Sequence, residues 1–193
     1  MLDDVPHLSR DDDVGSPEPS SPPRPGSPDG IDVHLARPHE LDAAGQAVAE
    51  AYLADLRVNE WYAARLRDAA SRAARATLLV AVDVRDGAVL GSLTYARGGT
   101  PYAQLADSDE CEIRMLGVRP EARGRGVGER LVRAAMAQGT TDGAVRMVLS
   151  TQTEMQAAHR LYERLGFTRR PDLDWVPEQD TSVQLIGYDR PLT

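Results

Sequence analysis

Residues 112–128 have the sequence EIRMLGVRPEARGRGVG, in which an apolar segment passes through a proline into three closely spaced glycines. The apolar part predicts a buried strand, and the pattern from Gly126 onward predicts a helix. Glycine lets a backbone approach a ligand without a clash from a Cβ atom. A helix start presents unpaired N–H groups and a positive dipole end, and arginine binds phosphate oxygens strongly. The turn at 123–128 is therefore a candidate anion site that suits a diphosphate.

Two common phosphate-binding motifs do not fit this turn. A dinucleotide-binding G-x-G-x-x-G motif starting at Gly124 would need its third glycine at Glu129, and one starting at Gly126 would need it at Leu131. A P-loop requires lysine, and all 22 residues counted as lysine or arginine are arginine. Taken alone, the turn is also compatible with an arginine-glycine loop of no special purpose.

Hydrophobic periodicity on both sides of this segment predicts an alternation of strands and helices. Asp86-Gly87 is typical of a tight hairpin, and Asn59 is a good helix N-cap. The predicted strands are 31–35, 78–84, 89–95, 111–118, 145–150, 167–169 and 183–188. The predicted helices are 38–52, 59–69, 126–138 and 153–165. Because 193 residues are too few for two comfortable domains, residues 31–193 are expected to form one.

Composition separates residues 1–30 from the rest of the chain. This segment holds seven of the 13 prolines, and its seven acidic residues against two arginines account for −5 of the formal net charge of −8. It offers too little apolar surface to offset the entropy lost on ordering, so we expect a disordered leader rich in proline, serine and aspartate. The remaining −3 argues against a nucleic-acid partner.

Cys111 is the only cysteine, which excludes an intrachain disulfide and favours a buried thiol over a nucleophilic one. A secretory signal pattern is missing, and so is an apolar run of about 18 residues that would span a membrane. A cytoplasmic protein without a membrane partner is therefore expected. His34, His39 and His159 lack the spacing of a metal site, so no metal is expected either.

The strand, the proline turn and the glycine turn together resemble the acetyl-coenzyme A motif of the GNAT superfamily of N-acetyltransferases. In that motif a strand ends in hydrophobic-x-Val, and R/Q-x-x-G-x-G/A then opens a helix; Arg123, Gly126 and Gly128 occupy its defining places. Residues 161–167, LYERLGF, are similar to a later helix-to-strand segment of the family. The resemblance implies an α/β (α+β) fold, with about four helices around a mostly antiparallel mixed sheet. That sheet has about seven strands and splays between strands 4 and 5.

The resemblance also implies acetyl-coenzyme A as the co-substrate. Its pantetheine arm is expected in the gap between strands 4 and 5, and its diphosphate on the glycine turn. Gln156 stands near the place where the family often has an asparagine, and its amide can make similar hydrogen bonds. The implied cofactor-binding residues are Leu116, Gly117, Val118, Arg123, Gly124, Arg125, Gly126, Val127, Gly128 and Gln156.

Two residues are candidates for catalysis by resemblance. Tyr162 stands where family members often carry the tyrosine that protonates the departing thiolate; the alternative is packing between helix and sheet. Glu112 stands where some members place a general base; the alternative is a strand carboxylate paired with Arg114. The expected reaction is direct attack of a primary amine on acetyl-coenzyme A in a ternary complex. A catalytically silent acyl-coenzyme A sensor of the same fold is the alternative function.

The acceptor is expected to be a small-molecule or peptide amine that binds near the early helices and the late hairpin. Trp61, Tyr62 and Trp175 are the candidate acceptor-binding residues, with core packing as the alternative. Several acidic loop residues either attract a cationic amine or are simply solvated. They are Asp107, Asp109, Glu110, Asp174, Glu178 and Asp180. A homodimer is a further expectation, by analogy with the family alone.

Overall fold

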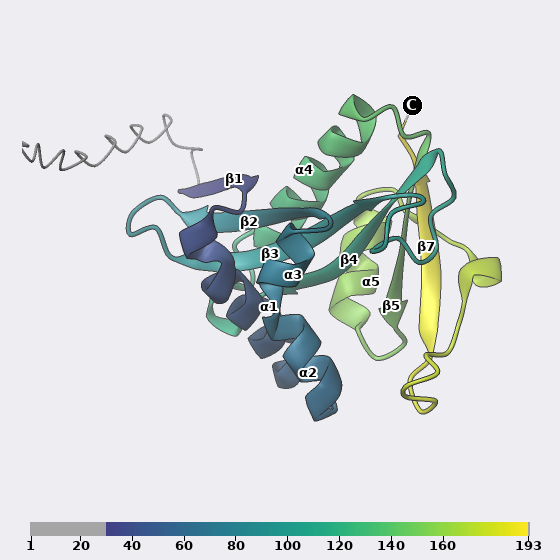
Figure 1. Cartoon of the computed structure of the whole chain (residues 1–193), viewed down its shortest axis with the longest axis horizontal. Coiled ribbons are helices and arrows are strands. Elements are labelled where there is room, and N and C mark those ends of the chain that lie inside the picture. Colours follow the sequence, from purple (N-terminus) through teal and green to yellow (C-terminus); the bar gives the residue numbers. More distant parts are fainter. Residues whose placement is uncertain (1–29, 193) are drawn as a thin grey trace, which may run out of the picture.

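The computed structural model describes residues 30–192, and the seven strands of this part form one mixed sheet in the order β1-β2-β3-β4-β5-β7-β6 (Figure 1). The strands are β1 (Ile31–Leu35), β2 (Thr77–Asp83), β3 (Val89–Arg97), β4 (Glu110–Val118), β5 (Arg146–Gln152), β6 (Thr168–Arg169) and β7 (Leu185–Pro191). All neighbouring strands are antiparallel except β4 and β5, which are parallel. The mostly antiparallel mixed sheet predicted from the sequence is confirmed.

The same described range contains five α-helices, one more than expected. They are α1 (Leu41–Asp55), α2 (Glu60–Arg67), α3 (Ala69–Ala73), α4 (Val127–Thr141) and α5 (Gln156–Arg164). Asn59 caps α2 as predicted, because its Oδ1 accepts the backbone N–H of Tyr62 at 2.8 Å. The single helix predicted over 59–69 is instead two helices. Asp68 leaves the helical conformation at ψ 68°, and its carboxylate accepts the N–H of Ser71 to start α3.

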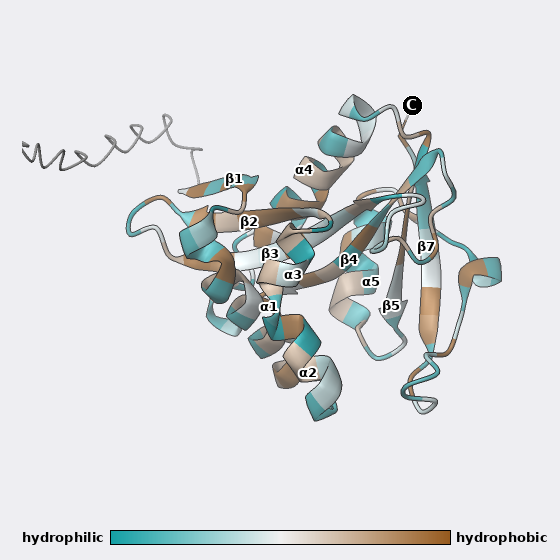
Figure 2. Ribbon diagram, viewed as in Figure 1, coloured by the Kyte–Doolittle hydropathy of each residue, from teal (hydrophilic) through white to brown (hydrophobic). Residues whose placement is uncertain are grey.

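Alternating side chains along β2 explain why helices cover both faces of the sheet. Leu78, Val80 and Val82 belong to a core cluster with residues of α1 and α3. Leu79 and Ala81 belong to the larger cluster that includes residues of α4 and α5. Successive strand side chains point to opposite faces, so this strand is buried on both. Figure 1 shows α1–α3 on one side of the sheet and α4 with α5 on the other, and Figure 2 shows apolar segments on the strands between them.

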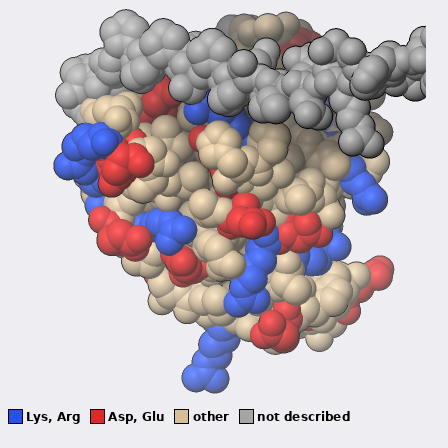
Figure 3. Space-filling view, turned by 60° about the vertical axis from the view of Figure 1, so that its left-hand side comes forward, with Lys and Arg blue, Asp and Glu red and all other residues tan. Residues whose placement is uncertain are grey.

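The predicted leader, residues 1–30, falls outside the described residues except for Gly30. Over residues 30–192, the helices lack the combination of length and apolar character that crossing a bilayer requires. Cys111 is buried as expected, and burial raises the pKa of its thiol to about 11. On the face shown in Figure 3, basic and acidic side chains are interspersed, which places many arginines beside carboxylates.

Candidate active site

β4 and β5 pair at one end only and then separate. Their parallel register covers Glu110–Ile113 of β4. Beyond this point β4 continues to Val118 and β5 continues to Gln152 without pairing with each other. The predicted splay between strands 4 and 5 is confirmed. It leaves backbone N–H and C=O groups facing a gap in the middle of the sheet, where a ligand can satisfy them.

A bulge in β4 lies at the start of this gap. Ser92 and Thr94 of β3 are two residues apart, whereas their partners Gly117 and Arg114 are three apart, so β4 carries one extra residue. Met115 has a φ of 50°. It is the only non-glycine residue between 30 and 192 with a positive φ. Bulges of this kind re-aim side chains and often lie beside active sites. The irregularity therefore marks the place where the strand turns its groups toward the gap.

The glycine turn is built for a close approach of backbone to ligand. Gly124 and Gly126 have φ of 75° and 77°, a backbone conformation that residues other than glycine rarely adopt. A Cβ on either residue would meet no heavy atom within 4 Å, so the space beside the turn is open. Gly126 is the N-cap of α4 and supplies no side-chain cap, which leaves the first turn to a ligand. At Gly128 a Cβ would lie 3.2 Å from Cδ2 of Leu161, so this glycine lets α4 pack against α5.

A groove of about 530 Å³ extends from the glycine turn to the splay. Most of the predicted cofactor-binding residues line it, namely Leu116, Gly117, Val118, Arg123, Gly124, Gly126, Val127 and Gly128. The structure does not bring the other two to the groove. The Arg125 guanidinium turns toward β2 and lies 2.8 Å from the Asp83 carboxylate. Gln156 is exposed and donates its amide N–H to the Thr153 carbonyl at 3.0 Å, whereas Met155 lines the groove.

Arg123 ties the glycine turn to α1. Its guanidinium makes two hydrogen bonds of 2.9 Å to the Asp55 carboxylate and one of 3.2 Å to the Ala51 carbonyl. Asp55 is the last residue of α1, where a cation is also favoured by the helix dipole. Two parallel N–H···O bonds fix the orientation of an arginine as well as its position. The arginine of the motif therefore holds the turn in place while it lines the groove.

Tyr162 lies on α5 and lines the groove. It is 5% exposed, and its ring centroid lies 5.7 Å from that of Phe167 and 6.2 Å from that of Tyr188. Burial raises the pKa of its hydroxyl, and no side chain or backbone group of residues 30–192 forms a hydrogen bond with that hydroxyl. The hydroxyl is therefore protonated and free to donate a hydrogen bond to a molecule in the groove.

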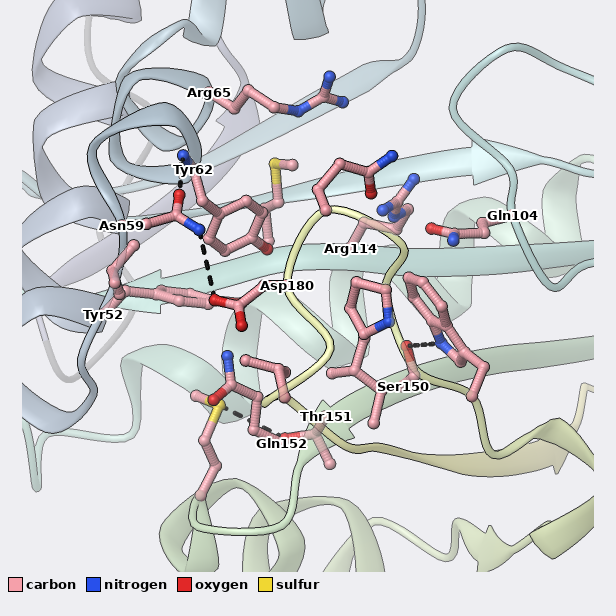
Figure 4. A pocket seen from close by; sticks show the side chains of 18 of the residues that line it. Tyr52, Asn59, Tyr62, Arg65, Gln104, Arg114, Ser150, Thr151, Gln152 and Asp180 are labelled. Atoms are coloured by element: carbon pink, nitrogen blue, oxygen red, sulfur yellow. Dashed lines mark hydrogen bonds between the residues drawn. The ribbon is translucent and has the colours of Figure 1, made fainter.

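A second cavity of about 310 Å³ lies on the other side of the splay (Figure 4). The structure brings the three predicted acceptor residues together in its wall: Trp61, Tyr62 and Trp175. Trp175 is fixed by a hydrogen bond of 3.2 Å from its Nε1 to Oγ of Ser150. The cavity and the groove share lining residues at the splay, which are Tyr52, Ile113, Met115, Ser150, Thr151 and Met155. Two molecules, one in each space, can therefore meet there.

Glu112 lies close to this centre but lines neither space. It is 1% exposed, and its Oε2 accepts the backbone N–H groups of Gln104 and Leu105 at 2.6 and 2.8 Å. Its Oε1 lies 3.6 Å from Nε of Arg114. The pairing with Arg114, considered above as the alternative to a general base, is thus present. The carboxylate holds both the loop at Gln104 and the Arg114 side chain, and these two residues do line the cavity.

The charged lining of the cavity was largely missed by the sequence analysis. Of the six acidic loop residues considered, only Asp180 lines it, and Asn59 donates a hydrogen bond of 3.3 Å to its carboxylate. Hydrogen bonds from Ser182 lower the pKa of Asp180. The other charges of the wall are arginines: Arg57, Arg65 and Arg114. Among 22 arginines, no spacing pattern distinguishes these three. Over residues 30–192, His, Cys, Asp and Glu side chains form no group of three or more that could hold a metal ion.

Comparison with known proteins finds a matching family and several similar curated proteins. A profile of the acetyltransferase (GNAT) family matches residues 43–167. Mycothiol acetyltransferase of Salinispora tropica is 34% identical over 160 residues, which cover 76% of this chain and 48% of that protein. N-alpha-acetyltransferase 30 of Schizosaccharomyces pombe is 40% identical over 83 residues, which cover 43% of this chain and 50% of that protein. The chain spans about half the length of these two curated relatives.

Solved structures share the fold at low sequence identity. A GNAT-family acetyltransferase of Staphylococcus aureus Mu50 superposes with a TM-score of 0.66 at 13% identity, covering 84% of this chain and 99% of that one. A putative acetyltransferase of Salmonella typhimurium, solved with its cofactor acetyl-CoA, gives 0.63 at 20% identity, with 84% and 94% covered.

The splayed mixed sheet and its flanking helices give this chain the fold that these acetyltransferase structures share. More particularly, the match over residues 43–167 shows that the chain belongs to the GNAT family of acetyltransferases.

Proposed function

We propose that this enzyme transfers the acetyl group of acetyl-coenzyme A to a primary amine of a small molecule or peptide. The observation that carries the proposal is the meeting of the groove and the cavity at Met115, where β4 and β5 separate. In the groove, the glycine turn and the start of α4 suit the diphosphate, and the free edge of β4 at Leu116 and Val118 suits the pantetheine arm. The cavity then holds the amine on the far side of the thioester.

Direct attack in a ternary complex is supported by the position and the protonation of the single thiol. Cys111 is the one thiol of the chain, and it lines neither the groove nor the cavity. Its burial and raised pKa keep it a neutral thiol, which is a poor nucleophile. A covalent acyl-enzyme at this residue would need both access and a thiolate. The amine itself therefore attacks the thioester carbonyl.

In the proposed reaction, the amine nitrogen forms a bond to the carbonyl carbon and the carbon–sulfur bond breaks. The Tyr162 hydroxyl gives its proton to the departing sulfur and regains one, through water, from the nitrogen that has become positive. Backbone N–H groups at the bulge, near Leu116, face the developing oxyanion. We assign Glu112 to holding the loop at Gln104 and the Arg114 side chain, because both of its oxygens are already engaged by these groups.

The test is incubation of the purified full chain with acetyl-coenzyme A and a broad panel of amines, with free thiol and acetylated amine measured together. We expect thiol release that depends on the amine and matches the acetylated product in amount. Tight binding of acetyl-coenzyme A without transfer to any amine would instead support the sensor alternative. Absence of binding by calorimetry would overturn both.

A further inference from the structure

The acceptor cavity continues into a second recess that is rich in arginine. This recess has a volume of about 340 Å³ and shares Arg65, Arg114 and Met115 with the cavity, so the two spaces adjoin. Arg75 of the segment after α3 adds a third guanidinium to its wall, with Asp68 as the one carboxylate. Across the cavity and the recess, four arginines therefore face two aspartates. The balance is positive, although the chain as a whole has a formal net charge of −8.

Two of the arginines in this wall keep their charge without a carboxylate partner in the described part of the chain, whereas Nε of Arg114 lies 3.6 Å from the Glu112 carboxylate. Arg119, Arg123 and Arg125 each form an ion pair with a carboxylate. Arg65 and Arg75 form none with any carboxylate of residues 30–192, and the guanidinium of Arg65 lies over the Trp61 ring at 5.1 Å. A cation left without a carboxylate partner beside a cavity is available to an anionic ligand.

A fully buried arginine adds further positive charge next to the recess and the cavity. Arg72 is 0% exposed, and its Nη1 donates to the carbonyls of Arg65 and Leu66, each at 2.8 Å. Its Nε and Nη2 have no hydrogen-bond partner among the described residues. Its charge acts on Tyr102 and Asp68 in the recess and on Tyr52 and Tyr62 in the cavity. Buried charge of this kind is costly unless something of opposite sign lies near it.

We propose that the acceptor is an amine that also carries a carboxylate, as in an amino acid, and that the Arg65–Arg75–Arg114 recess binds this carboxylate. This inference rests on the function proposed above and names its substrate class. Figure 4 shows Arg65 and Arg114 on one side of the cavity and Asp180 on the other, close to Tyr52 and Tyr62. The amine end is thereby directed away from the arginines and toward the splay.

The test compares pairs of amines that differ only in their charge. Glycine with glycinamide and 4-aminobutyrate with 4-aminobutyramide are suitable pairs, and spermidine serves as a purely cationic amine. Binding to the coenzyme A-loaded full chain is measured by calorimetry, and acetyl transfer by thiol release. We expect the carboxylate member of at least one pair to bind about tenfold or more tightly, as a charged hydrogen bond implies.

Variants of two arginines make the test specific to the recess. Arg65→Gln and Arg75→Gln each shrink the acid-to-amide preference toward one, whereas Arg67→Gln leaves it unchanged. Arg67 is a matched control, because it lies on α2 like Arg65, pairs with Glu60 at 3.5 Å and lines neither space. Each variant is compared on the same pair, so the different basicity of the two amines cancels.

The outcomes separate this inference from the function on which it rests. If amides or spermidine are bound and acetylated as well as the acids, the enzyme is an acetyltransferase but the carboxylate proposal is overturned. If acids bind through Arg65 and Arg75 but are never acetylated, the carboxylate site stands and the proposed reaction fails. If no carboxylate compound binds, or the preference survives both substitutions, the recess does not recognise the acceptor.

Discussion

The groove and the acceptor cavity meet at the same bulge, yet they are built in different ways. The groove is built around one short segment, 115–128, whose glycine turn exposes backbone, and residues of α1, β5 and α5 complete its walls. The cavity is made by side chains from stretches as distant as Tyr52 and Leu185. Binding sites made by backbone depend on where glycines permit an unusual conformation, and the spacing of these glycines can be recognised within a short stretch of sequence. Side-chain sites depend on which distant elements are folded together, so they vary without disturbing the fold.

The largest effect is expected from Gly126→Asp, which places a charge in the open space of the turn. Acetyl-coenzyme A affinity measured by calorimetry falls about a thousandfold, since like charges 4 Å apart near a surface repel by about 4 kcal/mol. Gly87→Asp is the matched control, because Gly87 also has a positive φ, of 74°, and open space around it. Full affinity in the Gly126 variant would refute the diphosphate assignment and, with it, the contrast between the two regions.

Removing the Tyr162 hydroxyl tests the junction of the two regions. Tyr162→Phe lowers kcat by about a hundredfold, the usual contribution of a positioned acid, and leaves acetyl-coenzyme A affinity unchanged. Tyr188→Phe is the control, because this neighbouring buried tyrosine makes only a 3.4 Å hydrogen bond to Glu163 and lines neither space. Steady-state kinetics with a good acceptor decides; equal turnover in both variants would reduce Tyr162 to a packing residue.

Glu112→Gln is expected to affect the acceptor cavity and not the groove. The amide nitrogen of the new glutamine is itself a donor, so it cannot accept the hydrogen bonds at Gln104 or the contact with Arg114. The acceptor KM therefore rises about tenfold, and the unfolding free energy falls by about 1–3 kcal/mol. The affinity for acetyl-coenzyme A stays the same. Glu121→Gln, with its carboxylate 69% exposed, serves as the control and should change stability by less than about 0.5 kcal/mol.

A general base at Glu112 would give a different result. In that case kcat would fall about a hundredfold or more, with KM little changed, and the acidic limb of the pH profile would move. Kinetics across pH, together with denaturant unfolding, distinguish the two roles of this carboxylate.

The smallest effect is an absence of change with pH. Burial raises the pKa of Tyr162 above the ordinary tyrosine value of about 10, so its acid form persists as the pH approaches that value. The rate of acetyl transfer should therefore not fall between pH 8 and 10 through loss of this proton. A decline in that interval that vanishes in Tyr162→Phe would show that the hydroxyl ionises early.

Sequence alone predicted the parts of the molecule whose pattern is local. All seven strands, the Asn59 cap and the glycine turn were predicted, because alternation, capping and glycine spacing each act over a few residues, whereas the splay was implied by the resemblance to the GNAT superfamily. The break at Asp68 was not, since that residue caps α3 within a pattern that remains helical on both sides. The bulge at Met115 also left no mark, because its register is set by β3.

Side-chain directions were the harder part of the site. Arg125 lies in the turn by sequence, yet Asp83, 42 residues away, draws its guanidinium toward β2. Gln156 begins α5 and bonds to Thr153 instead of facing the groove. In both cases the motif specifies the backbone correctly, while a partner outside the motif decides where the side chain points. For the same reason, the sequence analysis missed the arginines of the recess.

The two ends of the Asn59 amide connect helix folding with access to the acceptor cavity. Its oxygen starts α2 through Tyr62, and its nitrogen reaches Asp180 on the chain segment that leads into β7. The first contact is local and survives when the second breaks. An exposed hydrogen bond contributes only about 0.5–1.5 kcal/mol, so the distal segment can swing away without unwinding the helix. The segment that carries Asp180 can thus move away from the acceptor cavity to admit a bulky acceptor, while Tyr62 stays in place on α2.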